Sequence, residues 1–257
     1  MQLSIKIFTE YRKAGCDMIK LIYQGGGALF DARAELERLR DEKYRDFHSA
    51  LVPNVEKERV IGVRLPQIRS LASKIIKQDE TAEFLASPVG DSLEEKLLRG
   101  FVIAKARLPL DEHLAAVADF VPLIDCWSVC DSFAASLKFI KEERMAVWDF
   151  LQPYFDSPRA YDVRFAVVVT LDYFADTEYA ERAFKWFDMI DNDDYYVKTA
   201  LAWAVSVFFV HAPEATWGYL EKCSLDDFTF NKALQKITES YRVSLQDKKK
   251  IRSMKRR

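Results

Sequence analysis

The chain is poor in the residues that mark turns in β-sheets and α/β folds. Its 257 residues include 8 Gly and 8 Pro, whereas a sheet enzyme of this length usually needs more turn glycines. Neither a G-x-G-x-x-G nor a G-x-x-x-x-G-K-[ST] pattern occurs, so nothing indicates a nucleotide phosphate loop. A chain with few turn residues and many good helix formers is typical of an all-α protein.

Long uncharged apolar runs are also absent. A membrane helix needs about 18 to 20 apolar residues, and the longest runs, 165–169 and 201–210, are too short or contain a serine. The N-terminus carries charges and no apolar signal core. Four cysteines are too few for a disulfide scaffold. We therefore expect a cytoplasmic monomer with no membrane association.

Metal and cofactor chemistry has little support in the sequence. The three histidines are scattered, without H-E-x-x-H or paired Cys/His spacing, so we expect no metal and no cofactor. Cys126 and Cys130 lie four residues apart. They could bind a metal only with ligands that the sequence does not identify, and two buried thiols are the favoured interpretation.

The formal net charge of −2 hides an asymmetry along the chain. Residues 231–257 contain ten Lys and Arg against two acids, a net charge of +8, so the preceding residues carry −10. A basic stretch on an acidic body can be an arm that binds anions. A solvated tail that aids solubility explains the same charges, and both interpretations stay open.

Amphipathic segments separated by short polar linkers predict a row of helices. Ser92 and Glu95 have the spacing of a capping box at the start of one of them. The expected helices are 32–51, 66–77, 93–107, 111–120, 127–140, 144–155, 162–174, 177–190, 194–211, 213–223 and 228–245. Helices joined by short turns are antiparallel neighbours.

A charged position recurs in the early turns of alternate helices. Its members are Arg64, Arg99, Asp131, Arg164, Lys198 and Lys232, at intervals of 35, 32, 33, 34 and 34 residues. This period is typical of a solenoid of helix pairs, and the lack of a tetratricopeptide or ankyrin consensus favours HEAT-like repeats. We predict an all-α, right-handed α-solenoid of antiparallel helix pairs.

Equivalent positions of a solenoid line one face, and here that face carries five cations around a single acid. Most of the cations are expected near helix N-termini, where the helix dipole disfavours positive charge by about 0.3 to 1 kcal/mol. The arrangement predicts a concave cationic cleft that binds an extended anion, such as a nucleic-acid backbone. Solvated charges at helix ends are the alternative.

Two tryptophans are placed to meet the lone acid of this face. Trp127 lies four residues before Asp131, and Trp203 lies five residues after Lys198. Indole rings and a carboxylate together suit a cationic ligand, because the ring face attracts positive charge by about 0.5 to 2 kcal/mol. Core packing of the rings is the alternative for each tryptophan taken singly.

Four segments carry a resemblance to a known family. Residues 51–75, with the pattern G-V-R-L-P, residues 127–131 (W-S-V-C-D), residues 163–171 and residues 195–205 are similar to the AlkD-type DNA alkylation repair family. The resemblance covers about Leu36 to Arg252. It implies one HEAT-like-repeat repair domain over residues 35–257 and leaves residues 1–34 as an N-terminal extension of open role.

The resemblance implies duplex DNA as the partner and a glycosylase as the activity. Family members excise cationic alkylpurines such as 3-methyladenine and 7-methylguanine, without flipping the base into a pocket. By motif, Asp131 matches the catalytic carboxylate, Trp127 and Trp203 match the cleft tryptophans, and Arg164 matches an arginine that contacts phosphate. The carboxylate stabilises the oxocarbenium ion that forms on the deoxyribose.

One departure from the family pattern keeps other functions open. Active members have a further short helix just before the G-V-R-L-P segment, which enters the minor groove, whereas residues 53–59 are too few for it. The sequence thus resembles a paralogue branch without this helix. A protein that binds DNA without excision, and a HEAT-type scaffold for protein interactions, are the alternatives.

Overall fold

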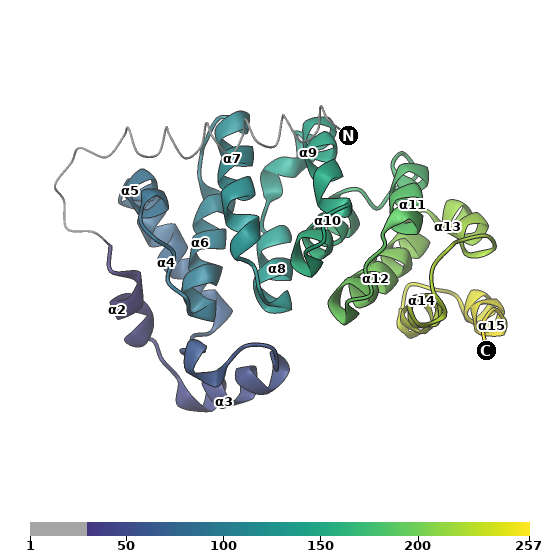
Figure 1. Cartoon of the computed structure of the whole chain (residues 1–257), viewed down its shortest axis with the longest axis horizontal. Helices are drawn as coiled ribbons and strands as arrows, with labels where there is room; N and C mark the ends of the chain where they lie inside the picture. Colours follow the sequence, from purple (N-terminus) through teal and green to yellow (C-terminus); the bar gives the residue numbers. More distant parts are fainter. Residues whose placement is uncertain (1–29) are drawn as a thin grey trace. The chain divides into compact units, whose positions relative to one another are not determined.

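The structure is a computed structural model that describes residues 30–257 (Figure 1). All of the regular structure in this range is helical. In chain order the elements are α2 (Ala32–Glu37), α3 (Glu42–Leu51), the 3-10 helix η1 (Lys57–Arg59), α4 (Leu65–Lys77), α5 (Thr81–Ala86), α6 (Leu93–Lys105), α7 (Leu110–Phe120), η2 (Val121–Leu123), α8 (Trp127–Ala134), η3 (Lys138–Lys141), α9 (Arg144–Phe155), α10 (Ala160–Tyr173), α11 (Ala180–Met189), α12 (Tyr195–His211), α13 (Pro213–Leu220), α14 (Asp227–Glu239) and α15 (Leu245–Ser253). The all-α prediction is confirmed.

The chain divides into two compact units. Unit 1 ends at Phe139, and unit 2 runs from Ile140 to Arg257. The expected N-terminal extension, 1–34, lies outside the described residues except for its last five. No described helix combines the length and apolar character required to span a bilayer.

Helix α6 is the centre of unit 1. It packs against α4 and α8 on its two sides, and α2, α5 and α7 also contact it. Its apolar side chains, such as Leu98, Phe101 and Val102, are at most 1% exposed. The capping box predicted at its start is present, because Ser92 Oγ accepts from the Glu95 amide at 3.3 Å and Glu95 Oε2 accepts from the Ser92 amide at 3.2 Å.

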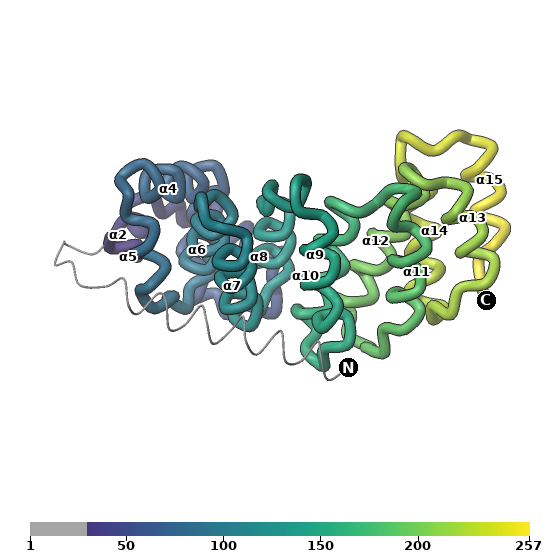
Figure 2. Tube along the Cα trace, turned by 90° about the horizontal axis from the view of Figure 1, so that it is seen from above, coloured from purple at the N-terminus to yellow at the C-terminus, as the bar shows by residue number. Residues whose placement is uncertain are grey.

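Helix α12 has the same place in unit 2. It packs between α10 and α14, and α13 covers it from the other layer. Figure 2 shows α10, α12 and α14 following one another along this unit. Val197, Ala200, Leu201, Val205 and Phe208 of α12 are buried, so the helix is apolar over most of its circumference, as a helix between two others must be.

The helix pairs repeat as the charge period predicts. Successive members of the charged row belong to α4, where Arg64 is the residue before the first turn, and then to α6, α8, α10, α12 and α14. These alternate helices stack as α4–α6–α8 in unit 1 and as α10–α12–α14 in unit 2. Neighbouring helices therefore pair as in an α-solenoid.

Three predicted helices differ most from the observed ones. The expected helix 32–51 is two helices, because Leu39 and Arg40 leave the helix before Asp41 caps α3. The helix from Trp127 ends at Ala134 instead of residue 140. Helix α14 ends at Glu239, and the basic segment after it forms the separate helix α15. Helix α5 was not expected at all.

Candidate functional site

Helix α8 of unit 1 carries Trp127 and Asp131 on one face. Trp127 is the first residue of the helix, and Asp131 follows one turn later, so their side chains point the same way. Both are partly exposed. The indole is fixed in orientation, because Trp127 Nε1 donates to the carbonyl oxygen of Leu51, the last residue of α3, at 3.1 Å.

An ion cluster holds the segment that leads into α8. Lys96 Nζ lies 2.7 Å and Arg59 Nη2 2.5 Å from the same oxygen, Asp125 Oδ2. Burial alone would raise the pKa of the Asp125 carboxyl, but the hydrogen bonds and charges of Lys96 and Arg59 outweigh it and hold the pKa below its usual range. Asn54 Nδ2 also donates to the Asp125 carbonyl at 2.7 Å. The start of α8 is thereby tied to the linker between α3 and α4.

The G-V-R-L-P segment is held by one buried acid. Glu94, with no exposed surface, accepts from the backbone amides of Ile61 at 2.9 Å, Gly62 at 2.8 Å and Val63 at 3.2 Å. Gly62 has a φ of +96°, and a Cβ at this position would lie 2.5 Å from the Asp41 carbonyl oxygen. The glycine is therefore required by both backbone conformation and close approach.

Arg64 is an exposed member of the charged row. Its Nη2 lies 3.0 Å from Asp41 Oδ2, and its guanidinium stands 4.6 Å from the centre of the Tyr44 ring. An ion pair at such an exposed position contributes little to stability. The guanidinium is accessible to a ligand that displaces Asp41, and its DNA contact stays a prediction.

Arg99 is an almost fully buried member of the charged row. The residue is 5% exposed, and its two Nη atoms donate to the carbonyls of Leu85 and Ser87 at 2.6 Å each. Its guanidinium covers the Phe84 ring at 4.7 Å, and burial lowers its pKa to about 10. These contacts close the C-terminal end of α5, so Arg99 stabilises unit 1, and the DNA contact expected of it stays a prediction.

Arg164 joins two helices of unit 2. It is 6% exposed, and its Nη1 donates to the Tyr196 carbonyl on α12 at 2.6 Å. Its charge also reaches Lys236 on α14. The pKa of Lys236 is lowered first by burial and then by the positive charges of Lys232 and Arg164. The Glu239 carboxylate acts in the opposite direction and raises the pKa of Lys236, so part of this positive charge is balanced within unit 2.

Lys198 is paired with acids in this structure. Its Nζ lies 2.7 Å from Asp193 Oδ1 and 3.6 Å from Asp226 Oδ1. The hydrogen bond with Asp193 is the largest of the contacts that raise the pKa of Lys198. A phosphate would have to compete with both carboxylates, so the contact expected of Lys198 stays a prediction.

Trp203 lines a pocket in unit 2. The pocket has a volume of 390 Å³ and is formed by α12, by α14 and by the residues that follow α14. Ser206, His211, Lys236 and Glu239 line it as well. An indole and the ammonium group of Lys236 in one pocket are an arrangement that can hold an organic ring next to a phosphate.

The expected site is divided between the two units. Trp127 and Asp131 share one helix face in unit 1, while Arg164 and Trp203 belong to neighbouring helices of unit 2. That all four side chains line one cleft stays a prediction. Within unit 1, Cys126 and Cys130 are buried thiols, as the favoured interpretation expected, and burial raises the pKa of Cys126 to about 11.

Sequence reasoning missed three residues that shape these surroundings. They are Lys236, Glu94 and Asp125. Lys236 had a usable signal, because it lies one helical turn after Lys232 and so shares its helix face. Glu94 and Asp125 had no such signal, because their sequence spacing does not distinguish a buried carboxylate that binds amides or cations from an exposed one.

Stacked alternate helices with a recurring charged position define a helical-repeat protein. The chain belongs to the DNA alkylation repair enzyme family, whose model matches residues 32–237, from the start of α2 almost to the end of α14. No curated protein matches the chain. Membership assigns a role in DNA alkylation repair and implies DNA as the partner.

Proposed function

We propose that the protein is a DNA glycosylase that removes cationic alkylpurines, such as 3-methyladenine and 7-methylguanine, from duplex DNA. The observation that carries the proposal is the common face of α8, on which Trp127 and Asp131 lie one turn apart. Family membership supports the repair role, and the fixed orientation of the Trp127 indole supports a preorganised site.

The chemistry requires little from the protein beyond charge and position. An alkylated purine with a fixed positive charge is already a good leaving group, so no general acid is required. The barrier arises from the oxocarbenium character that grows on the deoxyribose as the N-glycosyl bond breaks. A carboxylate at Asp131 stabilises that charge and orients the attacking water, while the indoles of Trp127 and Trp203 hold the sugar and the lesion.

DNA binding in this proposal rests chiefly on the cations of unit 2. Lys232 and Lys236 lie one turn apart on α14, and the charge of Arg164 acts on the second of them. Positive side chains at these positions attract the phosphates of the DNA backbone. Arg64 and Lys198 are proposed as additional contacts to phosphate. To make them, Arg64 must break its ion pair with Asp41, and Lys198 must break its ion pair with Asp193.

A second candidate function is DNA binding without excision. The segment between α3 and α4 contains only η1, a single turn of three residues. The resemblance implies that excising members carry a further helix here that enters the minor groove. Without it, the duplex is held less closely against Asp131, and binding can persist when the chemical step does not.

The decisive experiment is single-turnover excision from duplex DNA containing 7-methylguanine, at low salt. We expect Asp131→Asn to lower the rate about tenfold or more while the dissociation constant for DNA changes little. Asp149→Asn, at an exposed position of α9, is the control because it removes the same charge from a residue that the proposal does not use. Equal rates for wild type and Asp131→Asn would refute the catalytic assignment.

The same assay decides between the two candidates. Release of free base by wild type at a rate above that of the duplex alone supports a glycosylase. Tight binding with no release supports the second candidate. A wild-type protein that neither binds duplex DNA nor releases base would refute both.

A further inference from the structure

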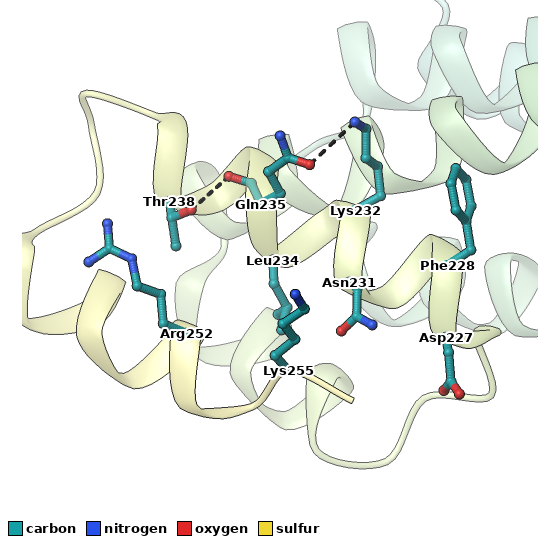
Figure 3. Close-up of a pocket in the computed structure, with 9 residues that line it drawn as sticks. All are labelled: Asp227, Phe228, Asn231, Lys232, Leu234, Gln235, Thr238, Arg252 and Lys255. Carbon is teal, nitrogen blue, oxygen red and sulfur yellow. Dashed lines mark hydrogen bonds between the residues drawn. The ribbon is translucent and has the colours of Figure 1, made fainter. Parts of the chain in front are cut away.

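A second cavity lies at the C-terminal end of unit 2. It has a volume of 640 Å³ and lies between α14 and the segment formed by α15 and the residues after it (Figure 3). Its lining residues are Asp227, Phe228, Asn231, Lys232, Leu234, Gln235, Thr238, Arg252 and Lys255. Three of them are cations, and they come from both sides of the cavity.

The C-terminal segment is held against α14 by specific contacts. The Asn231 side chain donates to the Arg256 carbonyl at 3.0 Å and accepts from the Arg256 amide at 2.9 Å. The Arg256 guanidinium stands 3.8 Å from the centre of the Phe230 ring, and Ile251 of α15 is fully buried. The basic C-terminus therefore forms one wall of a cavity, which favours an anion-binding role over a solvated tail.

The charges around this cavity favour an anion. Lys232, Arg252 and Lys255 face it with one acid, Asp227. Figure 3 shows Asp227 at the opposite end of the lining from Arg252. Asp227 also lies 3.5 Å from Arg256, so part of its charge is balanced within the protein.

The cavity extends past the part of the chain that the family model matches. The match ends at residue 237, whereas Thr238, Arg252 and Lys255 lie beyond it. Lys232 is the last member of the charged row, so the cavity continues that row with residues from outside the matched domain. Helix α15, which follows the matched residues, adds positive charge at the end of unit 2.

We propose that the cavity between α14 and α15 binds phosphates of the DNA backbone, as a contact additional to the proposed excision site. The proposal rests on the DNA binding proposed above. Lys232 and Arg252 lie well apart along the cavity in Figure 3, an arrangement that suits an extended polyanion better than a single small ion. Gln235 Nε2 already donates to Glu239 Oε1 at 2.7 Å, and Thr238 Oγ1 donates to the Gln235 carbonyl at 2.8 Å, so the three cations carry the proposed contact.

The test compares two double variants with equal charge. Arg252→Gln with Lys255→Gln removes two cations from the cavity, whereas Lys249→Gln with Lys250→Gln removes two exposed cations of α15 that do not line it. The dissociation constant for unmodified duplex DNA is measured at several salt concentrations. Each phosphate contact contributes about 0.9 to the slope of log K against log salt. We therefore expect a slope smaller by about 1.8 for the cavity variant and a nearly unchanged slope for the control.

Equal slopes for the two variants would overturn the proposed cavity site and leave the excision site untouched. A wild type that binds no duplex would overturn the DNA role as a whole. A slope difference in a protein that excises nothing would support the cavity site and refute the glycosylase. Thermal unfolding of both variants confirms that each one folds.

A titration with inorganic phosphate at constant ionic strength separates backbone phosphate from a free ion. We expect no saturation below about 1 mM, the affinity of a weak complex. The proposal would be overturned if phosphate saturated the wild type at lower concentrations, did not saturate the cavity variant, and the salt slope for DNA were the same in both. The cavity would then be assigned to a small phosphate compound.

Discussion

Replacing Glu94 by Gln should loosen the G-V-R-L-P segment. In the wild type, Glu94 Oε1 accepts from the amides of Gly62 and Val63, and Oε2 accepts from the amide of Ile61. Glutamine has almost the same shape but only one accepting oxygen. With that oxygen toward Gly62 and Val63, its NH₂ group faces the amide of Ile61, and two donors then meet in a site without exposed surface.

The size of the effect can be worked from these three hydrogen bonds. Bonds to a charged acceptor contribute about 1.5 to 3 kcal/mol each, and neutral ones contribute about 0.5 to 1.5. Two bonds are weakened by about 1 kcal/mol each, and the buried amide of Ile61 loses its acceptor at a further cost of about 1 to 3 kcal/mol. We expect the free energy of unfolding of unit 1 to decrease by about 3 to 5 kcal/mol.

Amide hydrogen exchange is the most direct assay, because it reports on each of the three amides. We expect Ile61, Gly62 and Val63 to exchange faster in Glu94→Gln, and amides of unit 2 to exchange as in wild type. Glu58→Gln, at an exposed position of η1, is the control. Unchanged exchange at the three amides, with an unfolding free energy within about 0.5 kcal/mol of wild type, would refute the structural role of Glu94.

Two further predictions concern unit 1. Gly62→Ala should lower the unfolding free energy by about 3 kcal/mol or more in denaturant titrations. The new Cβ would lie 2.5 Å from the Asp41 carbonyl oxygen, and the φ of +96° disfavours any residue with a Cβ. A loss below about 1 kcal/mol would show that the backbone at this position accepts a Cβ. Burial holds the pKa of His113 below 6.5, although its hydrogen bond to the Ile103 carbonyl opposes the shift. At this histidine the unfolded chain therefore binds a proton more readily than the folded chain. The contribution of neutral His113 to the free energy of unfolding is fully present above about pH 6.5 and decreases as pH falls toward the lowered pKa. His113→Gln should flatten this loss, and an identical pH profile would show that His113 does not cause it.

The repeat could be predicted from the sequence because its cause is local. A helix pair of nearly constant length returns each equivalent position after 32 to 35 residues, and charges mark that position plainly. The direction in which each charge points depends on what packs around its helix. Arg99 turns inward because α6 is surrounded by other helices and the end of α5 offers two carbonyl acceptors. Spacing alone carries no information about such an acceptor.

The site was predictable in part for the same reason. Trp127 and Asp131 share a face because four residues make about one turn, and the structure places both on α8. The contacts that fix the start of α8 join distant residues, 29 positions apart for Lys96 and Asp125, 66 for Arg59 and Asp125, and 76 for Leu51 and Trp127. No period in the sequence reports pairs at these separations. The proposed site residues were therefore easier to find than the residues that position them.

The linker between α3 and α4 connects these positioning contacts to the choice between excision and binding alone. Asn54 and Arg59, from this linker, both bind Asp125, and Leu51 just before it receives the indole N–H of Trp127. Because three contacts bind this segment to the start of α8, its position beside Trp127 does not depend on bound DNA. If excision occurs, the short linker takes the place of the further helix that the resemblance implies. The DNA must then reach the face of α8 without a helix inserted into its minor groove. The excision assay on the wild type therefore also tests whether that helix is required for the chemical step.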